Sequence, residues 1–152
     1  MLIAAHSISG GVIGEAIGNP FLAILFGFVS HFLLDLIPHF DTTDDGKLTK
    51  RQLILVGIDG SIGLAIIVYL LMGYTINPAS FLAGAFGAII PDLFDNVKLW
   101  EVSFRKSKFG KPFHAFHKLV HSNLNINHWK LGAFTQILVI LISIFLYLQF
   151  VV

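Results

Sequence analysis

Residues 114–121 read His-Ala-Phe-His-Lys-Leu-Val-His, which places histidines at positions 114, 117 and 121. A helix advances about 100° per residue, so these three imidazoles share one face within an arc of about 60°. Such a row predicts a metal-binding face if other segments supply further ligands. Two segments can do so: residues 31–41, His-Phe-Leu-Leu-Asp-Leu-Ile-Pro-His-Phe-Asp, and residues 91–95, Pro-Asp-Leu-Phe-Asp. The fold and the function both depend on whether the three segments meet.

The composition predicts a membrane protein. The chain has 152 residues, of which 55% are hydrophobic and 12% charged, and its mean hydropathy is +0.80. A soluble domain carries roughly 25% charged residues. The chain contains no cysteine, which excludes disulfides and thiolate metal sites. Any metal must therefore be held by imidazole and carboxylate groups, which favours zinc, manganese, iron or nickel over copper(I) and iron–sulfur clusters.

Apolar runs separated by turn signals predict an all-α integral membrane protein, a single multi-span domain built as a small bundle of about five transmembrane helices. A proline at position 38 ends the second run, because the residue before proline is disfavoured in a helix. Glycine and alanine in the fourth run permit close packing, and Pro91 predicts a kink or an interruption. The histidine row lies in a polar, basic region, residues 97–130. The predicted spans are residues 2–17, 21–37, 52–72, 81–96 and 131–151.

The distribution of basic residues predicts the orientation. Loops rich in Lys and Arg remain in the cytoplasm. Residues 39–51 hold Lys47, Lys50 and Arg51, residues 97–130 hold seven basic residues, and residues 73–80 hold none. We therefore expect a multi-pass protein of the cell (inner) membrane with a cytoplasmic N-terminus. All seven histidines then lie at the cytoplasmic end of the bundle, together with most of the aspartates.

Several polar side chains near the ends of apolar runs are candidate ligands. His31 and Asp35 are one helical turn apart, and ionisable groups in hydrocarbon are costly and usually functional. Asp92 and Asp95 sit at a helix C-terminus, where the macrodipole disfavours acids and a bound cation would offset this. The alternative is that these groups merely mark the water boundary. The predicted metal ligands are His6, Asp35, His39, Asp92, His117 and His121, and the candidate catalytic residues are His31, Asp95 and His114.

Three other polar residues receive weaker interpretations. Asp59, about two turns into its span, is expected to orient a ligand or pair with a lysine. His128 precedes a tryptophan and is interpreted as interfacial, and Glu15 lies at the opposite end with no assigned role. The basic and aromatic run over residues 100–116 predicts an interfacial helix or loop, or additionally a site for an anionic lipid headgroup. No motif indicates nucleic-acid binding.

These motifs resemble those of the YdjM-type family of membrane-bound metal-dependent hydrolases. The shared features are His6, Pro91-Asp92 with Asp95, and His117-Lys-Leu-Val-His121-Ser122, and residues 30–39 also look similar to the family. The chain departs from the family pattern at Lys118, where arginine is common, and at Asn96, where a histidine can follow the acid. The spacing of His31, Asp35 and a nearby histidine is also similar to one segment of the zinc-dependent phospholipase C and P1 nuclease family, whose members cleave phosphoesters.

The resemblance and the motifs together lead us to expect a membrane-embedded, metal-dependent hydrolase. The metal is expected to be zinc, with manganese or another divalent ion as alternatives. The expected substrate is a phosphoester of a lipid or of another amphipathic molecule, reached at the cytoplasmic interface. Two alternatives remain open. A transporter would carry polar groups near mid-bilayer on broken helices, whereas a scaffold with a structural metal would close the coordination with protein ligands.

Overall fold

The computed structural model describes residues 1–40, 50–124 and 128–151, and this part of the chain is all-α, as predicted. The loop residues Asp41 and Lys47, used above as a possible ligand and as an orientation signal, lie outside it. Five of the helices occupy nearly the ranges predicted for apolar helices. The helices are α1 (Ile3–Ile17), α2 (Pro20–Asp35), α3 (Lys50–Gly73), α4 (Pro78–Asp95), α5 (Glu101–Lys106), α6 (Gly110–Val120) and α7 (Trp129–Val151).

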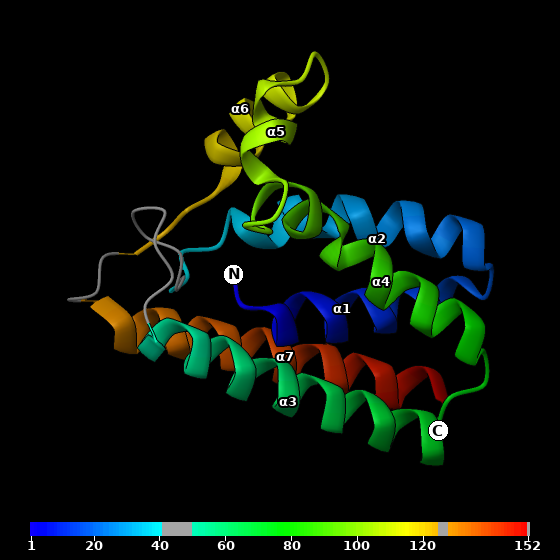
Figure 1. Ribbon diagram of the computed structural model, residues 1–152. Helices are drawn as coiled ribbons and strands as arrows, with labels where there is room; N and C mark the ends of the chain where they lie inside the picture. Colours follow the sequence, from blue (N-terminus) through cyan, green and yellow to red (C-terminus); the bar gives the residue numbers. More distant parts are fainter. Residues whose placement is uncertain (41–49, 125–127, 152) are drawn as a thin grey trace.

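Helix α1 lies at the centre of the bundle, with α2 and α4 on one side and α3 and α7 on the other (Figure 1). Most of its residues are buried, including the polar His6, Ser7 and Ser9. The outer helices α3 and α7 are largely exposed and apolar. Residues Gln52–Gly73 and Trp129–Gln149 are each long and apolar enough to cross a membrane, whereas α1 and α2 are shorter apolar helices.

Glycines bring α1, α2 and α4 into close contact. A Cβ atom on Gly84 of α4 would lie 2.9 Å from Gly14 Cα, and one on Gly10 or Gly27 would collide with the Gly84 carbonyl. The prediction that small residues let the fourth helix pack closely is confirmed. The predicted interruption at Pro91 is not observed, because the helix continues to Asp95 and the turn after the proline closes normally, with the Asn96 N–H donating to the Asp92 carbonyl at 2.8 Å.

Two acids, the buried Glu15 and the half-buried Asp59, accept backbone N–H groups at opposite ends of α1. Asp59 Oδ2 accepts the Ala4 N–H at 2.9 Å, one of the donors that a helix N-terminus leaves without an intrahelical partner. The Glu15 carboxylate accepts the N–H groups of Ile76 and Asn77, at 2.7 and 3.0 Å, and so fixes the loop that leads into α4. Asp59 thus caps α1, an option that the sequence interpretation did not include, and Glu15 has a structural role.

Helices α5 and α6 stand beside the ends of α2 and α4 and project to one side of the bundle (Figure 1). An aromatic contact holds them there: the ring of Phe32 on α2 lies 5.1 Å from Phe116 and 6.0 Å from Phe113, both on α6. Phe113 in turn lies 5.6 Å from Phe104 on α5. The polar region predicted over residues 97–130 therefore contains a helical hairpin docked on the bundle.

Candidate metal centre

Backbone pairing aligns the segment after α2 with the segment after α6. The Ser122 N–H donates to the Asp35 carbonyl at 2.8 Å, the His39 N–H donates to the Ser122 carbonyl at 3.1 Å, and the Leu124 N–H donates to the His39 carbonyl at 2.8 Å. Pro38 assists because it ends the helix and turns the chain toward α6. His121 is thereby brought beside His39, although 82 residues separate them.

The tightest group consists of His31, Asp35 and His117. The Nε2 atoms of the two histidines are 3.1 Å apart, and they lie 3.2 and 3.3 Å from Asp35 Oδ2. A tetrahedral zinc ion with bonds of roughly 2.0–2.1 Å holds its ligand atoms about 3.3 Å apart. Asp92 Oδ1 lies 3.8 Å from both Nε2 atoms. The triangle could therefore hold a metal ion, and Asp92 Oδ1 lies close enough to approach it.

In three of the histidines a protein acceptor holds the Nδ1–H group, which leaves Nε2 as the ring atom that could bind a metal. The Nδ1–H groups of His31 and His39 donate to the carbonyls of Ala88 and Ile37, each at 2.8 Å, and that of His117 donates to Asp95 Oδ2 at 3.1 Å. The Nε2 atoms of His31 and His117 face Asp35 Oδ2, and that of His39 lies 3.8 Å from Asp35 Oδ1. Metal-binding histidines are commonly oriented in this way by a partner on the other ring nitrogen.

A second group, formed by Asp35, His39 and His121, is more open. The two Nε2 atoms are 3.3 Å apart and lie 3.8 and 3.9 Å from the Asp35 carboxylate. The positively charged N-terminal amine of Met1 lies 2.8 Å from Asp35 Oδ1 and 2.6 Å from His39 Nε2, a contact that the sequence did not indicate. Asp35 thus belongs to both groups: His39 lies nearer to its Oδ1 atom and His121 nearer to its Oδ2 atom.

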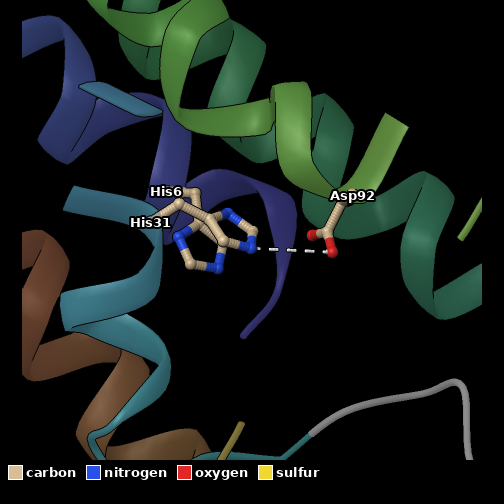
Figure 2. A group of neighbouring side chains, drawn as sticks. All are labelled: His6, His31 and Asp92. Atoms are coloured by element: carbon tan, nitrogen blue, oxygen red, sulfur yellow. Dashed lines mark ion pairs between the residues drawn. The ribbon is translucent and has the colours of Figure 1, made fainter. Parts of the chain in front are cut away.

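His6 completes the cluster from α1. Figure 2 shows its ring beside that of His31, with Asp92 approaching from α4; the two rings are stacked 4.0 Å apart. His6 Nε2 lies 3.1 Å from Asp35 Oδ1, but the angles make no hydrogen bond, and neither ring nitrogen has a hydrogen-bond partner among the residues that the structure describes. A fully buried imidazole without a partner is costly, and a bound cation would satisfy it.

Asp95 and His114 lie behind His117 rather than facing the other ligands. The Asp95 carboxylate accepts from His117, from His114 Nδ1 at 2.8 Å and from Arg105 Nε at 2.8 Å. Asp95 therefore orients His117. Arg105 helps to hold the Asp95 carboxylate in place. The sequence interpretation had instead grouped Arg105 with the basic residues expected to face lipid. His128 is exposed and belongs to none of the candidate groups.

His39 and His117 have pKa values shifted in opposite directions. Burial and the nearby N-terminal amine lower the pKa of His39 to about 4, so this ring is neutral at pH 7. Burial alone would lower the pKa of His117, but its hydrogen bonds to Asp35 and Asp95 raise it to about 9. In the metal-free protein His117 is thus protonated at pH 7, and an ion that binds at its Nε2 must displace a proton.

The cluster is closed on most sides. His6, His31, Asp35 and His39 are fully buried, whereas the side chains of Asp92 and His121 are 22% and 18% exposed. Asp92 and His121 are therefore the most exposed members of the three candidate groups. The nine residues singled out from the sequence, His6, His31, Asp35, His39, Asp92, Asp95, His114, His117 and His121, thus meet at one end of the bundle, where buried His/Asp triads could hold a metal ion.

Comparison with known proteins leaves the activity open, since no family model, curated protein or solved structure matches the chain.

Proposed function

We propose that this chain is an integral membrane, metal-dependent hydrolase that acts on a phosphoester of a lipid or another amphipathic molecule. The observation that carries the proposal is that three imidazoles, His31, His39 and His117, place their Nε2 atoms around Asp35 while a protein acceptor holds Nδ1 of each. Metal-binding histidines are commonly oriented in this way. A divalent metal, zinc before manganese, best accounts for them.

The membrane part of the proposal is supported by the exposed apolar surfaces of α3 and α7 and by their length. The other apolar helices, α1, α2 and α4, would complete about five spans. In the orientation proposed from the basic residues, the N-terminus and the candidate metal centre face the cytoplasm. Asp92 and His121, the partly exposed members of the cluster, would then meet the headgroup region.

The ligands divide between two positions. His31, Asp35, His117 and Asp92 would hold one ion, with His6 beside His31 and Asp92. Asp35, His39 and His121 would hold a second. The geometry thus favours a ligand role for His31, for which the sequence suggested a catalytic one. A bound zinc ion supplies Lewis acidity and lowers the pKa of water toward 7.

The protein's own proton acceptor would be His114. Its Nδ1–H donates to Asp95, which leaves Nε2 as the basic atom, and its side chain is 35% exposed. A histidine oriented by a carboxylate is a common general base. Asp95 would then position two histidines, His117 as a ligand and His114 as the base.

The test combines metal analysis with hydrolysis assays on a panel of phosphomonoester, phosphodiester and diphosphate lipids. We expect the purified protein to contain bound metal and to release phosphate from at least one class. Asp35→Asn should lose both metal and activity, and His114→Asn should lose activity but keep the metal. His128→Asn, the matched control outside the cluster, should keep both. Protein that contains metal but hydrolyses no member of the panel would overturn the proposal.

The second candidate is a membrane scaffold stabilised by a structural metal. The observation that favours it is the complete burial of four cluster residues, since structural metal sites are closed by protein ligands. The two candidates differ at Asp92. In a structural site Asp92→Asn should weaken metal binding and stability together, whereas in a catalytic site it should reduce turnover more than stability.

A further inference from the structure

The hairpin formed by α5 and α6, residues 99–120, exposes charged side chains of one sign only, and that sign is positive. Its only acidic residue, Glu101, is buried and paired with Lys98 at 2.8 Å and with Arg105 at 3.5 Å. Four lysines of the hairpin are exposed: Lys106, Lys108, Lys111 and Lys118. The exposed surface of the hairpin is therefore positive, with no acid of its own to neutralise it.

Large apolar side chains lie among these lysines. Phe109 is 80% exposed, Leu119 82% and Leu99 89%. They contrast with Phe104 and Phe113 of the same hairpin, which pack against each other and toward the bundle. Exposed apolar side chains rimmed by polar ones typically mark an interaction site.

The tip of the hairpin combines both features. Phe109 lies between the two helices, with Lys108 before it and Lys111 shortly after it. Exposed aromatics together with lysines are typical of segments that lie on anionic bilayers, where the ring enters the headgroup region and the lysines approach the phosphates. The hairpin also projects away from the bundle on the side of α2 and α4, at a steep angle to these helices (Figure 1).

We propose that the α5–α6 hairpin docks on the anionic lipid surface of the membrane that holds the bundle, with Phe109 inserted and the four lysines on lipid phosphates. This inference rests on the membrane part of the proposed function, not on hydrolysis. Charge complementarity selects the occupant, since four unopposed lysines match anionic headgroups. The same hairpin carries His117, which contacts Asp35. A lipid surface bound by the hairpin would therefore lie next to the candidate metal centre.

The absence of cysteine from the chain permits a direct test. Phe109→Cys is introduced into the full-length protein, labelled with a polarity-sensitive thiol fluorophore, and reconstituted into phosphatidylcholine bilayers with or without phosphatidylglycerol. We expect the label to report an apolar environment in the anionic bilayers and a more aqueous one in the neutral bilayers. Each lysine near an anionic surface contributes about fivefold to binding, so Lys106→Gln, Lys108→Gln and Lys111→Gln together should abolish the difference.

The matched control replaces Lys50 and Lys130, two exposed lysines outside the hairpin, by Gln; the difference should remain. An aqueous signal in both bilayers, as expected if a protein partner covers the surface, would overturn the inference. An apolar signal that is the same in anionic and neutral bilayers, and the same with and without the hairpin lysines, would also overturn it. Flotation of the labelled protein with the bilayers is read separately: failure to float would overturn the membrane assignment, whereas loss of hydrolysis alone would leave this inference intact.

Discussion

At the scale of single residues, His117 is the side chain that connects most of the candidate centre. Its Nε2 faces His31 and Asp35, and its Nδ1 donates to Asp95. We expect His117→Asn to weaken metal binding by more than the 10–100-fold that the loss of an outer partner typically costs, because it removes a ligand. Metal titration of the purified variant measures this. Equal affinity in His117→Asn and in the exposed control His128→Asn would contradict the assignment.

Asp95 should act one step further from the ion. Its carboxylate fixes the His117 ring and is itself held by Arg105. We expect Asp95→Asn to reduce metal affinity about 10–100-fold without lowering the number of ions bound at saturation. Arg105→Gln should have a smaller effect in the same direction, and Lys106→Gln, next to it and exposed, should have none. Loss of a whole ion in Asp95→Asn would show instead that Asp95 is a ligand.

The raised pKa of His117 predicts a pH dependence for the metal-free protein. Its pKa is about 9 in the folded chain against 6.5 for an unperturbed ring. The protonated ring therefore stabilises the fold fully below about pH 6.5, and this contribution is lost as the pH rises through about 9. Melting temperatures measured with a chelator should fall between pH 6.5 and 9.5 more steeply for the wild type than for His117→Asn. Parallel curves would contradict the prediction.

At the scale of elements, the glycine contacts hold α1 and α4 together and so set the distance between His6 and Asp92. Gly84→Ala places a methyl group against the backbone of Gly14 and the Gly10 carbonyl, and we expect it to destabilise the protein by about 1–3 kcal/mol. Gly60→Ala on α3, where a Cβ has nothing within 4 Å, should instead be neutral or stabilising by about 0.5–1 kcal/mol. Thermal unfolding in detergent compares the two variants; equal effects would contradict the close packing.

The sequence predicted those features of the fold that depend on a local pattern of residues. The positions of the apolar helices follow from hydropathy. The predicted row of three histidines on one helix face is only partly observed, because α6 ends at Val120, His121 lies in extended backbone beyond it, and His114 faces Asp95. The contacts between side chains of different helices were not predictable. Nothing in the sequence indicates that Asp35 contributes to two groups, that Arg105 pairs with Asp95, or that Asp59 caps α1, because each depends on how distant helices slide and rotate against one another.

At the scale of the whole molecule, a metal would join helices that are far apart along the chain. The candidate ligands come from α1, α2, α4 and α6 and from the segments after α2 and α6, so an ion would cross-link most of one end of the bundle. A ligand that binds only the folded state stabilises it by about 2.7 kcal/mol at a free concentration 100 times Kd. We therefore expect chelation to lower the melting temperature of the wild type and added zinc to restore it. Asp35→Asn, which lacks the shared ligand, should not respond to either treatment, whereas His128→Asn should respond like the wild type. A wild-type melting temperature that is the same with chelator and with zinc would contradict the prediction that a bound metal stabilises the fold.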